Sequence, residues 1–181
     1  MFALLLLCGA CSDDGEGDAT ATTTTSRPRP TDSTARTTST TVAEADEAVT
    51  AAYEAANRAF IDAAAIPDPS FPAIEATHTG PMLEQRREVL RALQLDGRII
   101  RYPADSQYRV VIESITIEDA VARVTFCAVD DAERVDARSG DVIAGGVVTV
   151  RGEAALRNAD GVWKLAEQRF DSRTEGTASC D

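Results

Sequence analysis

The cysteines and the single histidine are the residues of this 181-residue chain best suited to nucleophilic or metal chemistry. A thiolate nucleophile needs a nearby base, yet His78 has neither a nucleophile nor a second metal ligand beside it in the sequence. Cys127 and Cys180 have no CxxC spacing and no adjacent histidine, so they make a poor zinc site. We therefore predict no catalytic residue, no metal and no cofactor, and we expect His78 to bond a free carbonyl at a helix end.

The first ten residues and Cys11 are typical of an exported protein that receives a lipid. An apolar run of this length followed by small residues indicates the hydrophobic part of a signal peptide. The segment CGAC resembles a bacterial lipobox, in which small residues precede a cysteine that is acylated and becomes the mature N-terminus. We predict that residues 1–10 are a signal-peptide remnant and that Cys11 is lipidated. An ordinary N-terminus is the alternative, but the polar residues after Cys11 offer such a run no core to join.

Residues 11–41 have a composition that does not support a packed structure. Between residues 20 and 41, 14 of the 22 residues are Thr or Ser, and Pro28 and Pro30 interrupt the rest. Without large apolar side chains, nothing offsets the entropy lost on ordering. We predict a disordered tether that joins lipidated Cys11 to a folded domain, residues 42–181, on the extracytoplasmic side of the cell membrane.

The charge balance limits the partners of the chain. Thirty acidic residues against 18 basic ones give a formal net charge of −12. Nucleic-acid binding relies on neutralising phosphates with Lys and Arg, so we predict no nucleic-acid partner. No apolar run reaches the roughly 18–20 residues that span a bilayer. The lipid anchor is therefore the expected contact with the membrane.

Cys127 and Cys180 remain once Cys8 leaves with the signal and Cys11 carries lipid. An even number of cysteines in an oxidising compartment favours pairing. We predict a disulfide that holds the C-terminal tail on the sheet. Cys127 alternates with Phe126, so it is expected on the face opposite the core. A metal site and a catalytic thiol are the alternatives.

Helical periodicity fills the first half of the domain. Thr41 and Glu44 form a capping-box pattern, and apolar residues then recur at three- and four-residue spacing as far as Pro67. We predict a helix of about six turns that carries one apolar stripe. A short helix near residues 73–77 follows, and another runs from residue 80 to Asp96-Gly97.

After Gly97 the apolar period changes from 3.6 to 2, which predicts strands. The expected strands cover residues 98–102, 107–117, 120–129, 142–157 and 162–171. The alternation slips at Glu113-Ser114, as expected for a β-bulge that bends a strand. Residues 130–141 carry five acidic side chains and are predicted to form a solvated loop. Calcium is the alternative occupant of this loop, but its spacing fits no EF-hand, and Arg134 and Arg138 offset the acidic charge.

Helices followed by antiparallel strands predict an α+β domain, in which N-terminal helices pack in a curved antiparallel sheet around a cone-shaped cavity. This order of elements resembles the nuclear transport factor 2-like superfamily, which includes SnoaL-like cyclases and ketosteroid isomerases. Uncharacterised actinobacterial lipoproteins of that superfamily are the most similar. The segments that carry the resemblance are VTAAYEAANRAFIDAA, ATHTGPMLEQRREVLRAL, RVTFCAVDDAERVDARSGDVIAGG and GVWKLAEQRFD.

The resemblance implies a cavity but not an activity, because the superfamily hosts enzymes, binders and docking modules. Its steroid isomerases use an acid in the cavity with a Tyr hydroxyl. The residues expected to line the cavity here are Tyr53, Asn57, Phe60 and Trp163. Asp62, Glu153 and Glu167 are considered as the acid, but the inward strand positions read Val, Phe, Ala and Leu, so no carboxylate partner for Tyr53 is evident.

These observations favour a membrane-anchored extracytoplasmic lipoprotein whose domain acts without catalysis. It would bind a small apolar ligand or dock to another envelope protein. The alternative is a small isomerase, cyclase or hydrolase that uses Tyr53 and an unidentified carboxylate. A homodimer in which two sheets pack together is a further expectation.

Overall fold

The computed structural model describes residues 41–180, which form three helices and seven strands. The predicted signal remnant, lipidated Cys11 and all but the last residue of the predicted tether lie outside the described residues. The helices are α1 (Val42–Ala65), α2 (Pro72–Thr77) and α3 (Gly80–Leu95). The strands are β1 (Arg98–Arg101), β2 (Arg109–Glu118), β3 (Val121–Asp130), β4 (Glu133–Asp136), β5 (Val142–Ala144), β6 (Val148–Ala159) and β7 (Val162–Glu175).

Helix α1 begins at the predicted capping box. The Thr41 hydroxyl accepts the Glu44 backbone N–H at 3.3 Å, and the Glu44 carboxylate accepts the Thr41 N–H at 2.9 Å. The helix ends at Ala65 with Ile66 as its C-cap, because the proline that follows disfavours helical geometry in Ile66. Its buried face is Val49, Tyr53, Ala56, Ala59, Ala63 and Ala64. The small residues of this face let the helix lie close to its neighbours.

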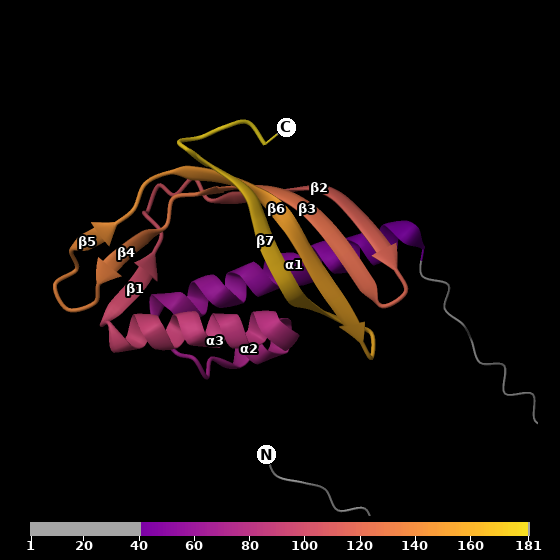
Figure 1. Ribbon diagram of the computed structural model, residues 1–181, viewed down its shortest axis with the longest axis horizontal. Coiled ribbons are helices and arrows are strands. Elements are labelled where there is room, and N and C mark those ends of the chain that lie inside the picture. The colour runs from indigo at the N-terminus through magenta and orange to yellow at the C-terminus, as the bar shows by residue number, and fades with distance from the viewer. Residues whose placement is uncertain (1–40, 181) are drawn as a thin grey trace, which may run out of the picture. The chain divides into compact units, whose positions relative to one another are not determined.

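The main sheet is antiparallel, with the strand order β2-β3-β6-β7. It bends over α1, while α2 and α3 lie along the other side of that helix (Figure 1). The predicted bulge is confirmed, because the β2–β3 register shifts between Ile112 and Ser114. Strands β6 and β7 carry two further shifts, one of them at Gly152. A Cβ atom at Gly152 would stand 2.1 Å from the Arg169 carbonyl oxygen, so this bend requires glycine.

A second sheet, with the order β1-β4-β5, corrects the prediction for residues 130–145. Strand β4 lies inside the predicted solvated loop and pairs with β1, with Val135 opposite Ile99 and buried. The predicted strand 142–157 is two strands, β5 and β6, separated at Gly145-Gly146. Gly146 has φ +131°, a conformation that interrupts a strand and that few other residues adopt. The charged residues beside Val135 obscured the strand pattern of β4 in the sequence. The alternation across residues 142–157 gave no sign of the break between β5 and β6.

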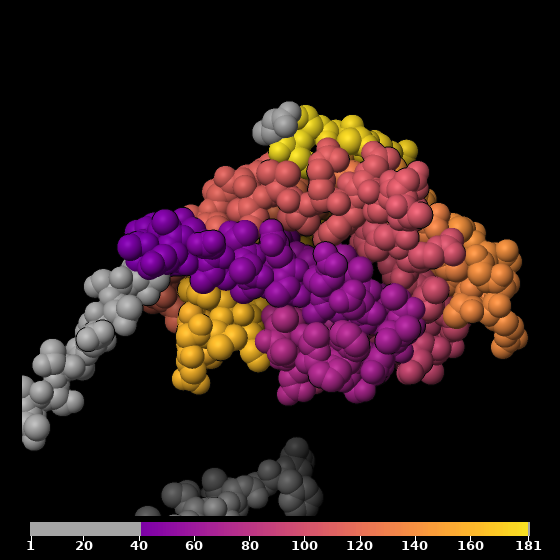
Figure 2. Space-filling model, turned by 180° about the vertical axis from the view of Figure 1, so that it is seen from behind, coloured from indigo at the N-terminus to yellow at the C-terminus, as the bar shows by residue number. Residues whose placement is uncertain are grey.

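The largest apolar cluster lies between α1 and the concave face of the main sheet, with Tyr53, Phe126, Leu156 and Leu165 among its buried members. A second cluster joins the three helices. Seen from behind, α1 runs along the open side of the sheet with its outer surface exposed (Figure 2). Within residues 41–180 no helix is long and apolar enough to cross a membrane.

Candidate functional site

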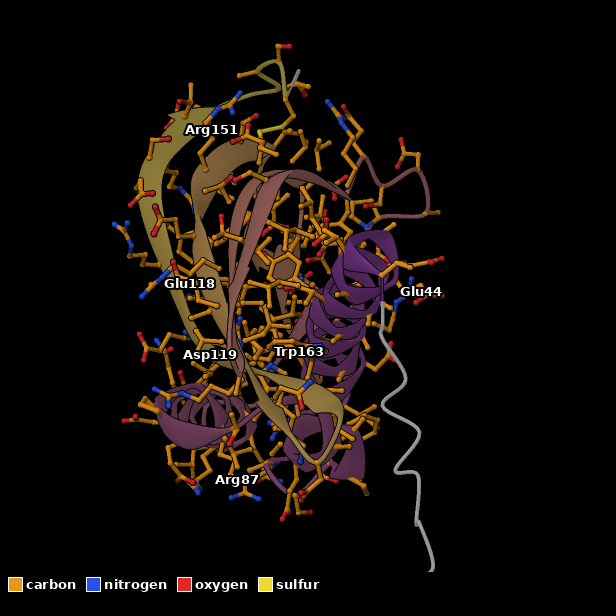
Figure 3. The ribbon with its side chains drawn as sticks, turned by 90° about the vertical axis from the view of Figure 1, so that its right-hand side faces the viewer. Glu44, Arg87, Glu118, Asp119, Arg151 and Trp163 are labelled. Atoms are coloured by element: carbon orange, nitrogen blue, oxygen red, sulfur yellow. A yellow bond between two sulfur atoms is a disulfide. The ribbon has the colours of Figure 1, made fainter. Side chains whose placement is uncertain are left out.

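A cavity of about 120 Å³ lies between α1, α3 and the concave face of the main sheet. Side chains occupy most of the space between the curved sheet and α1 (Figure 3). The polar side chains that line the cavity are Tyr53, Asn57, Arg86, Tyr102, Tyr108, Asp130 and Gln168, and Phe60, Phe126 and Phe170 are among its apolar walls. A polar lining within an apolar core makes this cavity the candidate binding site.

A larger hollow, of about 350 Å³, is an open groove beside the start of α3 and the strands β6 and β7. Two charged residues of this groove pair with each other, because an Arg169 nitrogen lies 2.7 Å from the Glu153 carboxylate. The Arg169 side chain is largely exposed to solvent, and that of Glu153 is half-buried. The smaller cavity is therefore the better candidate, since its polar groups lie inside the domain.

Tyr53 places a hydroxyl in the cavity from the buried face of α1. The side chain is 1% exposed, and its ring centroid lies 5.5 Å from that of Phe126. The Gln168 side-chain amide donates to the Tyr53 hydroxyl oxygen at 3.2 Å. Burial raises the pKa of Tyr53 well above its ordinary value, so the hydroxyl keeps its proton at neutral pH.

Arg86 lines the cavity from α3. Its Nη2 atom donates to the Gln168 side-chain oxygen at 2.8 Å, and its Cζ atom lies 4.1 Å from the Phe60 ring centroid. Its Nε atom is shielded from solvent and has no hydrogen-bond partner in the described part of the chain. Burial lowers the pKa of Arg86 from its very high ordinary value.

Tyr102 and Tyr108 form the aromatic end of the cavity, with ring centroids 5.1 Å apart in an edge-to-face arrangement. Burial is the main reason that the pKa of Tyr102 is raised, and the charge of Asp130 adds to it. Burial and the charge of Asp130 raise the pKa of Tyr108 to about 12. Both hydroxyls are therefore neutral donors at ordinary pH.

Asp130 is an inward carboxylate, so the prediction that the inward strand positions carry none is wrong. It is the last residue of β3, it lines the cavity and its carboxylate accepts the Ala132 backbone N–H at 3.0 Å. The sequence holds the signal, because the inward alternation over Ala122, Val124, Phe126 and Ala128 continues to Asp130. Because Asp130 begins a run of acidic residues, the sequence pattern assigns it to the loop that follows the strand.

The neighbouring Asp131 is also buried rather than solvated, at 6% exposure. Its carboxylate accepts the Ser106 hydroxyl and the Gln107 backbone N–H, both at 2.6 Å. These bonds hold the segment between β1 and β2 that carries Tyr102 and Tyr108. Asp131 is thus a positioning residue for the cavity wall, and its role depends on a long-range contact that local sequence cannot show.

Three of the four residues predicted to line the cavity do so: Tyr53, Asn57 and Phe60. The Asn57 amide donates to the Tyr53 backbone carbonyl at 3.0 Å, so it is partly satisfied by its own helix. Trp163 lies outside the cavity lining and packs against the main core cluster near the start of β7. Gln168 and Phe170, farther along the same strand, reach the cavity instead.

His78 lies at the end of α2, 1% exposed, and its Nδ1 atom is 3.2 Å from the Ile74 carbonyl oxygen. The predicted helix-end role is confirmed. Thr77 Oγ1 lies 2.9 Å from the same nitrogen, while Nε2 is buried and has no hydrogen-bond partner among residues 41–180. Burial first, and the charge of Arg86 second, lower the pKa of His78 to about 4.

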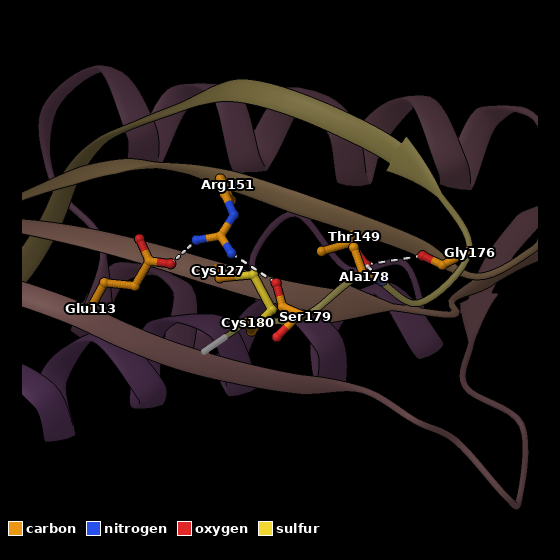
Figure 4. The surroundings of a disulfide bond; sticks show 8 residues. All are labelled: Glu113, Cys127, Thr149, Arg151, Gly176, Ala178, Ser179 and Cys180. Carbon is orange, nitrogen blue, oxygen red and sulfur yellow. Dashed lines mark hydrogen bonds and ion pairs between the residues drawn. A yellow bond between two sulfur atoms is a disulfide. The ribbon is translucent and has the colours of Figure 1, made fainter.

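Cys127 and Cys180, which the sequence predicts to pair, are joined by a disulfide on the convex face of the sheet (Figure 4). Thr149 Oγ1 donates to the Gly176 carbonyl at 2.9 Å and accepts the Ala178 N–H at 2.8 Å. Arg151 donates to the Ser179 carbonyl at 2.8 Å. The tail is therefore fixed over β3 and β6, on the other side of the sheet from the cavity.

The acidic loop does not gather into a metal-binding cluster. Asp136 uses one carboxylate oxygen to accept the backbone N–H groups of Arg138 and Ser139, each at 2.9 Å. Within the part of the chain that the structure describes, no three His, Cys, Asp or Glu side chains could hold a metal ion together. The loop carboxylates instead shape their own turn.

No family model matches the chain, and no curated protein matches it. Solved structures do resemble it. The intermembrane space region of the chloroplast protein ARC6 is 15% identical, with a TM-score of 0.54 over 67% of this chain and 95% of that one. The Kfla4162 protein from Kribbella flavida is 14% identical, with a TM-score of 0.49 over 72% of this chain and 95% of that one.

A nuclear transport factor 2-like protein of unknown function from Silicibacter pomeroyi is 17% identical, with a TM-score of 0.43 over 72% of this chain and 99% of that one. Sequence identities this low show a similarity of fold and not of function. The structure confirms the predicted α+β class, in which N-terminal helices pack in a curved antiparallel sheet.

Proposed function

We propose that this chain is a lipid-anchored extracytoplasmic protein whose domain binds a small ligand in the cone cavity without catalysis. The observation that carries the proposal is the set of polar side chains inside the core. A core that only held the sheet on the helices would be apolar, because burying polar groups without full pairing costs free energy. Retaining Arg86, Asp130 and three Tyr hydroxyls at one cavity favours a bound molecule.

The size and lining of the cavity limit the kinds of ligand that it can hold. A cavity of about 150 Å³ holds one benzene molecule, so a cavity of about 120 Å³ suits a ligand of that size or smaller. The charged and hydroxyl side chains of the lining favour a ligand with a polar group over a wholly apolar one. This refines the apolar ligand expected from the sequence.

A fragment screen on the purified protein tests the binding role. Native mass spectrometry should find small polar fragments bound to the wild type, and Ala128→Leu should weaken the best of them at least about tenfold by filling the cavity. Ala155→Leu is the matched control, because Ala155 lines the surface groove and not the cavity, so its affinity should be unchanged. Unchanged affinity in a folded Ala128→Leu protein would contradict the proposal.

The location of the protein is proposed from the predicted lipid site and is supported by the disulfide, since disulfides persist in oxidising compartments. The two or three acyl chains of a bacterial lipoprotein anchor stably where a single chain does not. Radiolabelled palmitate should enter the wild-type chain and the Cys8→Ser control, but not Cys11→Ser. Label that persists in Cys11→Ser, or that is missing from the wild type, would refute the anchor.

A second candidate function, an acid–base enzyme, is favoured by the presence of the Asp130 carboxylate and the Tyr102 hydroxyl in the lining of one cavity. Tyr53 does not pair with an acid in the structure but accepts from Gln168. The screen separates the two candidates, because a binder releases its ligand unchanged and an enzyme releases a product. Docking to an envelope protein stays a prediction, and so does a homodimer in which two sheets pack together. The tail at Cys180 occupies part of the sheet face that such a dimer would use.

A further inference from the structure

Arg86 occupies a position on α3 that the helix otherwise gives to buried apolar residues. Met82 and Leu90, one turn to either side, are 3% and 0% exposed. Residues four apart lie on the same helix face, so Arg86 belongs to the stripe that faces the interior. This places a guanidinium in the wall of the cavity, where an apolar side chain would complete the core.

The Arg86 charge has no counter-ion within residues 41–180. No Asp or Glu oxygen of those residues lies within 4.0 Å of its guanidinium, whose hydrogen-bond partner is the neutral Gln168. The adjacent Arg87 differs, because it pairs with Glu75 at 3.1 Å and Glu84 at 3.4 Å. Arg87 points out of the domain (Figure 3). One of two neighbouring arginines is thus neutralised at the surface, and the other is left unpaired in the cavity wall.

Asp130 shares the cavity but does not neutralise Arg86. Its carboxylate accepts the Ala132 backbone N–H, and it lies beyond ion-pair distance of the guanidinium. The cavity wall therefore holds a carboxylate and a guanidinium that do not form an ion pair with each other.

Two hydrogen-bond donors lie in the part of the cavity wall that Arg86 and Tyr53 form. The Arg86 Nε–H is shielded from solvent without a partner. The Tyr53 hydroxyl oxygen accepts from Gln168, which leaves its own hydrogen free to donate. Gln168 fixes both groups, since its amide accepts from Arg86 through oxygen and donates to Tyr53 through nitrogen.

We infer that the ligand of this cavity is a small monocarboxylate and that Arg86 is the residue that selects its charge. A planar carboxylate matches the guanidinium and would accept charge-assisted hydrogen bonds from Arg86 together with the Tyr53 hydroxyl. Its apolar part would contact the rings of Phe60 and Phe126. The inference rests on the proposed function and deepens it by naming the ligand class.

Calorimetric titration of the full chain with sodium propionate, propionamide and inorganic phosphate tests the inference. Propionate should bind at least about tenfold more tightly than the size-matched neutral amide, because the amide cannot form the charge-assisted hydrogen bond. Phosphate, which shares the charge but not the shape, should bind more weakly than propionate. Arg86→Met should remove the preference for propionate over the amide, and Arg87→Met should keep it.

The melting temperature without ligand separates recognition from a structural role. Arg86→Met should melt within a few degrees of the wild type, because removal of a partly buried charge without a counter-ion offsets the lost hydrogen bond to Gln168. A much lower melting temperature, equal binding of propionate and propionamide, tighter binding of phosphate, or a preference that survives in Arg86→Met would overturn the inference. Equal binding of acid and amide would leave the cavity as a ligand site, whereas a screen without any bound fragment would refute the proposed function itself.

Discussion

Loss of the Cys127–Cys180 disulfide should lower the free energy of unfolding by about 4 kcal/mol. The bond closes a loop with a sequence separation of 53, and a cross-link of that span removes loop-closure entropy from the unfolded chain on the chain-entropy model. Denaturant unfolding of the wild type with and without reductant measures the difference. Because the hydrogen bonds of Thr149 and Arg151 to the tail remain, the reduced protein should stay folded.

The double variant Cys127→Ala/Cys180→Ala is the control for the reductant, which should not change its stability. The disulfide lies on the convex face and the cavity on the concave one, so reduction should leave fragment affinity unchanged. Equal unfolding curves for the oxidised and reduced wild type would show that the cross-link contributes nothing. Loss of fragment binding on reduction would show that the two faces are coupled.

The second large effect is a loss of stability on acidification, caused by His78. Its pKa is lowered from an ordinary value of about 6.5 to about 4, chiefly by burial. Between these two values the unfolded chain binds a proton that the folded chain does not, so stability falls as the pH drops through this window. From pH 7 to pH 5 the loss should be about 2 kcal/mol, and it should not exceed about 3 kcal/mol at lower pH.

His78 is the only histidine in the chain, which simplifies the measurement. An NMR titration of its ring protons in the folded protein should give a pKa near 4, and denaturant unfolding at pH 7 and pH 5 should give the stability change. His78→Gln should flatten the dependence between pH 5 and pH 7. A ring that titrates near 6.5 in the folded state would contradict this account of His78.

Local patterns in the sequence predicted the elements whose cause is local. The capping box at Thr41 and Glu44, the helix end before Pro67 and the bulge at Glu113-Ser114 all appear in the structure. Each depends on side chains or periodicities within a few residues. The pairing of Cys127 with Cys180 could also be predicted, because counting cysteines leaves few partners.

The features that the sequence did not predict depend on contacts between segments far apart in the chain. Strand β4 exists because β1 pairs with it, and its own sequence, ERVD, has a single apolar residue. Asp130 and Arg86 both interrupt an otherwise apolar face. From the sequence alone, a charged residue at such a position indicates only that the strand or helix ends there or that its side chain reaches solvent. Trp163 shared the predicted inward face of its strand, but the cavity lies farther along that strand.

The most direct test of a ligand cavity at Arg86 is the NMR signal of the Arg86 Nε–H group during titration with propionate. We expect a distinct Arg86 Nε–H signal that shifts progressively and saturates, while the signal of Arg87 stays in place. Propionamide should shift the Arg86 signal far less. An Arg86 signal that does not move while propionate is added in excess would contradict carboxylate binding in the cavity.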